Sequence, residues 1–248
     1  MATLYIVATP IGNLEDISLR ALRILGEVDF ILCEDTRTTK VLLDHYQLTT
    51  PTISYHQHSD EQKTNKIIEL LANGKNLALV SEAGTPGISD PGGKLIQKVI
   101  EKFGVGTMHT SPVQIESVPG PSAITAALSI SGIPTDKFVF MGFPPHKKGR
   151  QTFIKKILAS EYPAVVYESK HRILKFLNEL KKAARENMEP DKPGQPQAKP
   201  IDLTSVVVVR ELSKMHETVH RGEIKSIIEK IKENKDEQKG EFVVIIGK

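Results

Sequence analysis

A loop dense in glycine and proline, Ser81–Gly93 (SEAGTPGISDPGG), lies between two segments of regular hydrophobic pattern. The apolar run 77–80 predicts a buried strand before the loop, and apolar residues at helical spacing over 95–100 predict a helix after it. In open α/β sheets, ligands bind at loops that leave the carboxyl end of a strand in this way. The four glycines let the backbone approach a ligand closely, and the two prolines stiffen the loop. An ordinary connection is the alternative, but the length and density of the loop favour a binding role.

The residues before and after this loop alternate between strand and helix patterns. Continuous apolar runs predict strands at 4–8, 30–33, 52–55 and 77–80, and helical spacing predicts helices around 17–25, 41–43, 67–71, 95–100 and 124–130. The stretch Gly104–Glu116 has no clear period and is expected to be irregular. The pattern predicts a parallel sheet covered by helices on both faces, with the ends of its strands meeting at one edge.

A turn-rich segment, Gly132–Asp136, predicts a boundary between two α/β domains, 1–132 and 133–248. The second domain is expected to contain strands at 138–143, 164–167, 206–209 and 218–220, helices at 151–158, 171–184 and 224–231, and a last strand at 242–246 that closes the sheet. Its segment 187–200 is rich in proline and polar residues and predicts a mobile loop.

Composition limits the class of protein and its partners. The single cysteine, Cys33, lies in an apolar run, which is typical of a small buried side chain and excludes an internal disulfide. No run approaches the ~18 apolar residues of a membrane span, and no signal-peptide pattern begins the chain. We therefore expect a cytoplasmic protein without a membrane partner. The net charge of +3 permits an anionic partner, although a solvated lysine-rich surface explains it equally well.

Several common sites are excluded by the sequence. The Ser81–Gly93 loop has no G-x-G-x-x-G pattern, and Lys94 is followed by Leu95, so it is not a Walker loop. The histidines lack the spacing of metal ligands, and with one cysteine we expect no metal site. No G-x-S-x-G motif indicates a hydrolase.

Polar clusters follow three of the strands expected in the second half. The segment 146–150 contains Lys147, Lys148 and Arg150 and is suited to phosphates of a nucleic acid, with a solvated loop as the alternative. The other two clusters are 168–172 and 210–217. Their charged residues are expected to face a site or to form ion pairs, Glu168 with Arg210 or Arg172 with Glu211.

Six motifs in order resemble the ribosomal small-subunit methyltransferase I family of the tetrapyrrole-methylase superfamily. They are LYIVATPIGNL at 4–14, CEDTR at 33–37, the loop 81–92, PGPSA at 119–123, YES at 167–169 and REL at 210–212. The resemblance covers nearly the whole chain. The chain differs from the family pattern at Glu82, where the family usually has aspartate, and in extra residues at 107–114 and 188–200.

The resemblance implies two α/β domains of the class III type with an S-adenosylmethionine cleft between them, and a homodimer. It implies 2′-O-methylation of a cytidine in the decoding region of 16S rRNA. The cofactor-binding residues carried over by position are Pro10, Gly84, Thr85, Ile88, Ser122, Ala123, Tyr167 and Gly240. Capping of the helix that starts near Ser122 is an alternative role for that residue.

Catalysis by alignment of oxygen, methyl and sulfur is expected, with Glu168 or Glu211 as a base and Arg210 as a positioning group. RNA is favoured over DNA because the acceptor is the 2′-hydroxyl. Two other functions remain open: a carbon methyltransferase acting on a tetrapyrrole, which a porphyrinogen assay would detect, and a non-catalytic ribosome assembly factor, which cofactor turnover with RNA would exclude.

Overall fold

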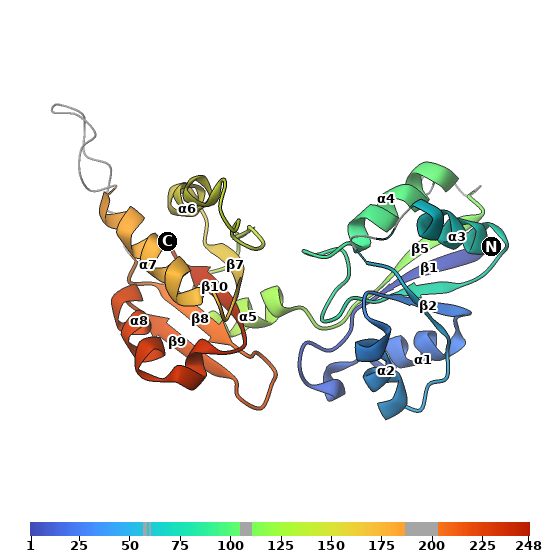
Figure 1. Ribbon diagram of the computed structural model, residues 1–248, viewed down its shortest axis with the longest axis horizontal. Coiled ribbons are helices and arrows are strands. Elements are labelled where there is room, and N and C mark those ends of the chain that lie inside the picture. Colours follow the sequence, from blue (N-terminus) through green and yellow to red (C-terminus); the bar gives the residue numbers. More distant parts are fainter. Residues whose placement is uncertain (57–58, 60, 105–110, 187–202) are drawn as a thin grey trace. The chain divides into compact units, whose positions relative to one another are not determined.

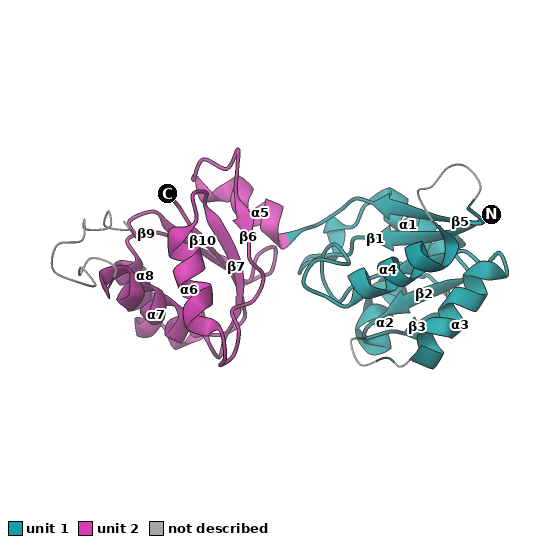
Figure 2. Ribbon diagram, turned by 90° about the horizontal axis from the view of Figure 1, so that it is seen from above, with its two compact units in different colours: residues 1–122 teal, residues 123–248 magenta. Residues whose placement is uncertain are grey.

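The computed structural model describes residues 1–56, 59, 61–104, 111–186 and 203–248, which form two compact units, 1–122 and 123–248 (Figure 2). The loop predicted at 187–200 and the extra segment predicted at 188–200 lie outside the described residues. In the described part of the chain, no helix is long and apolar enough to cross a membrane.

Unit 1 is a parallel α/β domain. Its described residues form a five-stranded sheet in the order β3-β2-β4-β1-β5, with all neighbours parallel. The strands are β1 (Ala2–Val7), β2 (Phe30–Cys33), β3 (Thr52–Ser54), β4 (Leu77–Leu79) and β5 (Val113–Val118). The helices are η1 (Leu14–Asp16), α1 (Leu19–Glu27), α2 (Thr36–His45), α3 (Glu61–Ala72) and α4 (Gly92–Phe103). The predicted parallel sheet of this half is confirmed.

Helices cover both faces of this sheet, α1 and α2 on one and α3 and α4 on the other (Figure 1). Along β1, Leu4 and Ile6 pack with α3 and α4, whereas Val7 packs with α1 and α2. Alternate residues of a strand point to opposite faces, so a strand that is buried on both sides needs apolar residues at every position. This requirement explains the continuous apolar runs.

The expected irregular stretch Gly104–Glu116 is wrong in its last part, because β5 begins at Val113. Residues 105–110 of that stretch, and with them part of the extra segment at 107–114, lie outside the described residues. β5 is an edge strand, so only its ends, Val113 and Val118, are buried, and polar residues interrupt its pattern. A search for continuous apolar runs misses such a strand.

Unit 2 contains a mixed sheet in the order β6-β7-β10-β8-β9, in which β6 and β7 are parallel and the other neighbours antiparallel. Its strands are β6 (Val139–Phe140), β7 (Ala164–Ser169), β8 (Val206–Arg210), β9 (Thr218–Gly222) and β10 (Glu241–Ile246). Its helices are α5 (Ala123–Ser131), α6 (Arg150–Ala159), α7 (Ile173–Glu186), α8 (Ile224–Glu233) and η2 (Lys235–Gln238). The last strand lies between β7 and β8, so it completes the sheet from its middle.

The first unit ends at Ser122 rather than at the predicted residue 132. The reason is α5, whose buried Ile124, Ala127 and Leu128 pack on one face of the unit 2 sheet with Val207 and residues beside it. Helices α6, α7 and α8 cover the other face. A turn-rich segment after a helix therefore does not mark the boundary here, because the helix before it already belongs to the second core.

Replacing Leu128 by alanine tests the assignment of α5 to unit 2. Leu128 is 6% exposed, so the truncation should lower the free energy of unfolding of unit 2 by about 2–5 kcal/mol. Hydrogen exchange should accelerate in β7, β8 and β10 and remain unchanged in β1 and β4. Ile130→Ala on the same helix is the control, because Ile130 is 38% exposed and its truncation should cost within about 0.5 kcal/mol. Faster exchange in unit 1 with Leu128→Ala would contradict the assignment.

Candidate functional site

The loops that follow β1 and β4 are joined by backbone hydrogen bonds. Thr9 N donates to Gly84 O at 2.9 Å, and Gly84 N donates to Thr9 O at 3.0 Å. The Thr9 hydroxyl also donates to Ser81 O at 3.2 Å. Because β1 and β4 are neighbours in the parallel sheet, these bonds hold both loops together at the carboxyl edge of the sheet.

The turn after β5 approaches the same loops closely. The Thr85 hydroxyl donates to Pro121 O at 3.1 Å. Gly84 has a φ of +82°, and a Cβ there would lie 3.3 Å from Ile11 Cγ2 and 3.6 Å from Pro121 O. A side chain at position 84 would therefore be strained and would press on the neighbouring loop.

Asp90 closes the far end of the Ser81–Gly93 loop. Its Oδ1 accepts hydrogen bonds from Gly87 N at 2.7 Å and from Gly92 N at 2.8 Å. Gly92 is the first residue of α4, and a Cβ there would lie 3.0 Å from Gly87 N. The loop is therefore tied at both ends, as a binding loop with a preformed shape should be.

A hollow of about 540 Å³ opens at the carboxyl ends of β1, β2 and β4. It is lined by Thr9, Pro10, Leu14, Asp35, Arg37, Thr38, Thr39, Val41, Leu42, Val80, Ser81 and Glu82. Of the predicted cofactor residues, Pro10 lines it, and Gly84 and Thr85 lie in the loop whose first residues, Ser81 and Glu82, line it. Ile88, in the same loop, exposes 45% of its surface.

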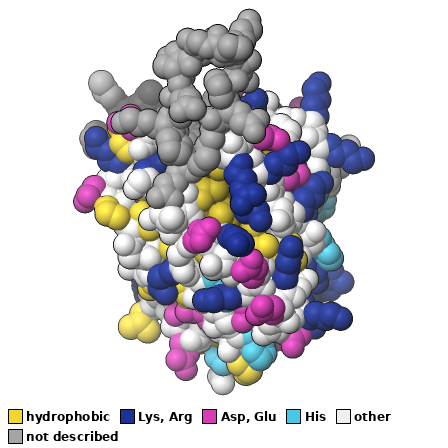
Figure 3. All heavy atoms as spheres, turned by 90° about the vertical axis from the view of Figure 1, so that its left-hand side faces the viewer, with side chains coloured by type: hydrophobic (Ala, Val, Ile, Leu, Met, Phe, Trp, Pro, Cys, Tyr) yellow, Lys and Arg dark blue, Asp and Glu magenta, His cyan; other side chains and the backbone are white. Residues whose placement is uncertain are grey.

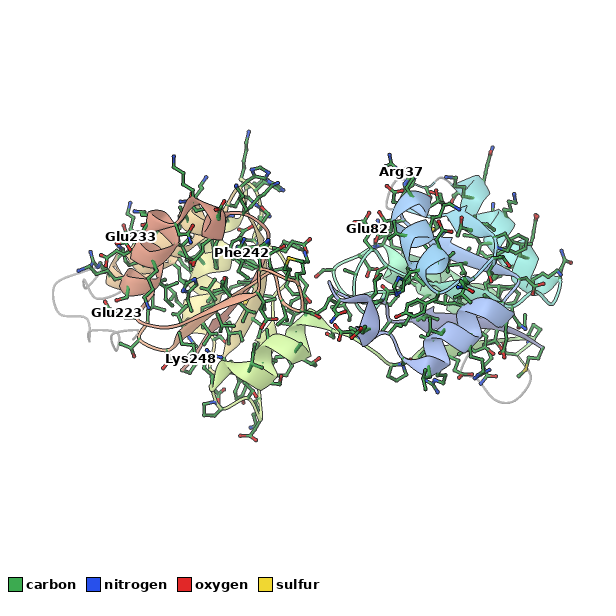
Figure 4. The ribbon with its side chains drawn as sticks, turned by 90° about the horizontal axis from the view of Figure 1, so that it is seen from below. Arg37, Glu82, Glu223, Glu233, Phe242 and Lys248 are labelled. Carbon is green, nitrogen blue, oxygen red and sulfur yellow. The ribbon has the colours of Figure 1, made fainter. Side chains whose placement is uncertain are left out.

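Three charged side chains, Asp35, Arg37 and Glu82, contribute to the lining of this hollow. Arg37 and Glu82 lie on the same side of unit 1 (Figure 4). Arg37 Nη2 lies 2.6 Å from Asp35 Oδ2, and hydrogen bonding by Arg37 lowers the pKa of Asp35 to about 2. Burial, with Asp90 and Glu82 nearby, raises the pKa of Glu34. Asp35 and Arg37 belong to the CEDTR motif, but they were not among the predicted site residues. The missing information was that β2 lies beside β4, which the strand order supplies.

In unit 2, the predicted residues Ala123 and Tyr167 come close together. Ala123 is the first residue of α5, and the Tyr167 hydroxyl hydrogen-bonds the backbone of Ile124. The Tyr167 ring packs against Phe140 and Phe143, with centroids 4.9 and 5.4 Å away. Burial raises the pKa of Tyr167 to about 12, so the phenol stays neutral at physiological pH. Ser122 is the residue immediately before α5.

Glu168 lies on the opposite face of the unit 2 sheet from Tyr167. It is in register with Phe242, which packs with α6, α7 and α8, whereas Tyr167 packs with α5. Glu168 Oε1 lies 2.9 Å from Arg172 Nη2, and its Oε2 lies 3.7 Å from Arg150 Nη2. The predicted ion pair of Glu168 with Arg210 is therefore wrong, because Arg150 and Arg172 occupy the carboxylate.

Arg210 and Glu211 hold two parts of the chain, the connection between β8 and β9 and the residues around the start of β10. Arg210 donates to Lys239 O at 2.6 Å and to His216 O at 2.8 Å. Glu211 Oε1 accepts from Glu241 N at 2.8 Å and from Lys214 Nζ at 3.1 Å, so the predicted Arg172–Glu211 pair is also wrong.

The packing around residue 240 explains why it is a glycine. Its φ is +97°, and a Cβ at this position would collide with the carboxylate of Glu211. The glycine is therefore required for the packing of Glu211 between β8 and β10, without any ligand. This contact accounts for the residue independently of the predicted cofactor role.

The predicted RNA-binding residues separate into two kinds. Lys147 and Lys148 are exposed in the loop before α6, as a phosphate contact requires. Arg150 is 4% exposed and its Nε lies 2.6 Å from Glu179 Oε2, so its expected contact with phosphate is wrong. Around α7 and α8, Lys and Arg are mixed with Asp and Glu (Figure 3), as on an ordinary solvated surface. Among the described residues, no group of three or more His, Cys, Asp or Glu side chains could hold a metal ion.

Comparison with known proteins identifies the family. Residues 3–228 match the Tetrapyrrole (Corrin/Porphyrin) Methylases. The Ribosomal RNA small subunit methyltransferase I of Hydrogenobaculum sp. (strain Y04AAS1) is 41% identical over 247 residues, which are 99% of this chain and 95% of the relative. The protein of that name from Thermotoga maritima is 36% identical over 100% of this chain and 99% of its own. The chain belongs to this methylase family. The family resemblance of the six motifs is confirmed.

Solved structures of low sequence identity share the fold of this methylase. Diphthine synthase aligns with a TM-score of 0.67 and 14% identity over 100% of this chain and 90% of its own. The uroporphyrin-III-C-methyltransferase of Thermus thermophilus aligns with a TM-score of 0.61 and 18% identity over 98% and 93% of the two chains. These likenesses confirm the predicted fold class.

The carboxylate of Glu211 should make the stability of the methylase depend on pH. Burial alone would raise the pKa of Glu211, but hydrogen bonds from Glu241 and Lys214 and the charges of Lys214 and Arg210 outweigh it, so the pKa lies below its ordinary value of 4.5. The stabilisation is therefore present above pH 4.5 and is lost as the pH falls through the lowered pKa. Urea unfolding of wild type and Glu211→Gln should differ most near neutral pH and converge in acid.

Glu233→Gln is the control for this pH dependence, because Glu233 is exposed at the end of α8. Its unfolding curve should follow that of the wild type at every pH. A difference between wild type and Glu211→Gln that grows as the pH falls would contradict the lowered pKa.

Proposed function

We propose that the chain transfers a methyl group from S-adenosylmethionine to the 2′-hydroxyl of a cytidine in the decoding region of 16S rRNA. The observation that carries this proposal is the relationship over nearly the whole chain, at 36–41% identity, to proteins named ribosomal RNA small subunit methyltransferase I. The substrate would be the small ribosomal subunit, which places the reaction in the cytoplasm. We further propose that the active form is a homodimer.

The residues of the chain fit a cofactor held mainly by backbone. The loops of unit 1 are tied together by the Thr9–Gly84 bonds, and they contain a glycine where a Cβ would press on Ile11. An exposed Ile88 offers an apolar surface, and nearby carboxylates suit a ligand with a sulfonium charge. The residues proposed to bind the cofactor are Pro10, Gly84, Thr85, Ile88, Ser122, Ala123 and Tyr167. Gly240 is left out because its packing against Glu211 explains it.

The chain contributes alignment more than acid–base chemistry. S-adenosylmethionine supplies an activated methyl group, so the protein must mainly hold the acceptor oxygen in line and exclude water. The loops that form the carboxyl edge of unit 1 are suited to this task because they are tied at several points. The neutral Tyr167 hydroxyl hydrogen-bonds a backbone group at the start of α5 and would help to keep that segment in place.

The three residues predicted to be catalytic have other partners. Glu168 pairs with two arginines, Arg210 donates to two backbone carbonyls, and Glu211 accepts from Glu241 N and Lys214. A base must be able to reach the proton that it removes, and groups held in this way are not free to do so. We therefore propose no base among them. Lys147 and Lys148 are retained as contacts to rRNA phosphates.

A tetrapyrrole substrate is the second candidate. It is favoured by the likeness to the uroporphyrin-III-C-methyltransferase and to the cobalt precorrin-4 methyltransferase, which aligns with a TM-score of 0.64. Those identities are 18% and 17%, which support the fold and do not select a substrate. The higher identity to rRNA methyltransferases over almost the whole chain favours RNA.

A methylation assay with labelled cofactor distinguishes these functions. Purified protein, isotope-labelled S-adenosylmethionine and small subunits from cells that lack the modification should give one labelled 2′-O-methylcytidine by mass spectrometry. The same protein should not label a porphyrinogen precursor. Labelling of the precursor would support the tetrapyrrole alternative, and cofactor binding without turnover on either substrate would support a non-catalytic assembly factor.

Gly84→Ala tests the cofactor loop. The added Cβ at φ +82° would press on Ile11 and should disturb the bonds between the β1 and β4 loops, so the Kd for S-adenosylmethionine should rise about tenfold or more by calorimetry. Gly74→Ala is the matched control, because Gly74 has the same φ of +82° in the same unit and no atom within 4 Å of its Cβ position. The control should lose stability through backbone strain and keep its cofactor affinity. Equal affinities for both variants would remove Gly84 from the site.

A further inference from the structure

Residues 143–149 form the last part of the connection between β6 and α6 and carry the exposed lysines Lys147 and Lys148. We call this segment the lysine loop. Pro144 and Pro145 lie near its start and have no backbone N–H, so their carbonyls are the backbone groups by which they can be held. Contacts to those carbonyls therefore help to position the lysines, together with the bond from Arg150 N to Lys147 O at 3.3 Å.

Two arginines hold these carbonyls. Arg172 Nη1 donates to Pro144 O at 3.0 Å, and Arg150 Nη1 donates to Pro145 O at 3.1 Å. Arg150 begins α6 directly after the loop, whereas Arg172 comes from a separate segment just before α7. Both guanidinium groups are largely withdrawn from solvent, with side chains 5% and 17% exposed. They act as inward anchors of the loop rather than as surface charges.

Glu168 holds both arginines at once. Its side chain is 0% exposed, and its two oxygens lie 2.9 Å from Arg172 Nη2 and 3.7 Å from Arg150 Nη2. Arg150 is further held by Glu179 Oε2 at 2.6 Å from its Nε. Two buried cations are thus balanced by two carboxylates. Taking away the central carboxylate would leave two guanidinium groups close together without sufficient negative charge, which a buried site does not tolerate.

The contact between the Glu168 carboxylate and the Arg150 guanidinium is electrostatic and includes no hydrogen bond. Glu168 Oε2 and Arg150 Nη2 are both buried and make no hydrogen bond among the described residues. Neutralising Glu168 would therefore release Arg150 from it directly, with no hydrogen bond left to keep the two side chains together. Among the described residues, Arg150 would then keep its hydrogen bonds to Glu179 and Pro145 O and its position over the Phe176 ring, without the carboxylate charge of Glu168.

We infer that Glu168 is a positioning residue for the RNA substrate: through Arg150 and Arg172 it holds the lysine loop so that Lys147 and Lys148 meet rRNA phosphates. The inference rests on the proposed function, because it takes RNA as the partner. It replaces the expectation that Glu168 is a general base. A base would act on the rate of the chemical step, whereas a positioning residue of this kind acts on RNA affinity and its dependence on salt.

Binding to unmodified small subunits at several salt concentrations tests the inference without requiring turnover. Lys147→Ala with Lys148→Ala should reduce the slope of log Kd against log salt by about 2, because two phosphate contacts are lost. Glu168→Gln should weaken binding about tenfold and reduce the slope in the same direction. In the double-lysine variant, Glu168→Gln should add little further loss, because the contacts that it positions are already absent.

A control variant, a test of folding and an alternative variant accompany this experiment. Glu186→Gln is the matched control, because Glu186 forms an exposed pair with Lys182 at 3.5 Å on α7, and it should bind like the wild type. S-adenosylmethionine affinity should be unchanged in every variant, which shows that the fold is intact. If Glu168→Gln does not fold, Arg172→Lys decides, since a lysine cannot reach both Glu168 and Pro144 O with the same fork of donors.

Wild-type binding and salt slope retained in the folded Glu168→Gln or Arg172→Lys variant would overturn the inference. Full additivity with the lysine substitutions would also overturn it, as would wild-type protein that shows no salt-dependent binding.

Methyl transfer is measured in parallel on the same subunits. If Glu168→Gln slows the chemical step about 100-fold or more and leaves Kd unchanged, the role of general base is restored and the inference fails. Salt-dependent binding that is lost as expected, but without any methyl transfer by the wild type, would reject the proposed function and keep the positioning role.

Discussion

The backbone pair between Thr9 and Gly84 is the contact on which the candidate site of unit 1 depends. It joins the loops of two adjacent parallel strands by two hydrogen bonds, at 2.9 and 3.0 Å, beyond the point where the strands themselves end. The hydroxyls of Thr9 and Thr85 then attach Ser81 and the turn at Pro121 to the same place. A loop of many glycines has much conformational entropy to lose, and these bonds remove it before a ligand arrives. The glycine density therefore serves close approach, and not flexibility.

In unit 2, buried charged side chains hold the loops, whereas in unit 1 backbone hydrogen bonds join them. Its sheet has apolar residues on both faces, yet the row that contains Phe242 carries Glu168 on one neighbouring strand and Arg210 on the other. Both charged side chains are buried, and each reaches outward to fasten a loop: Arg210 the chain at Lys239 and His216, Glu168 the lysine loop through its arginines. Breaking either set would leave a buried charged group without its partners, so these contacts restrict the positions of the loops.

Hydrophobic pattern was enough to predict most elements of the chain, because strands that are buried on both faces need apolar residues throughout. It failed at β5, where one edge of the strand is exposed. It predicted the helix α5, but not that this helix packs on the second sheet. Of the site, the loops were predicted from glycine and proline alone. The partners of Arg150 and Glu211 could not be predicted, since they depend on which helices and strands are neighbours, and charge type does not say whether a side chain faces inward.

The alternation of side chains along β7 separates two roles that the YES motif places next to each other. Tyr167 packs with α5 and hydrogen-bonds its first turn, whereas Glu168 points to the face covered by α6 and α7 and contacts the two arginines that hold the lysine loop. Because successive residues of a strand face opposite sides, two adjacent residues cannot both line one surface of this sheet. If Tyr167 belongs to the cofactor site, then Glu168 does not share that surface, and its presence beside Tyr167 in the motif has to be explained by what it holds. A short motif can thus link two separate parts of a site through a single strand.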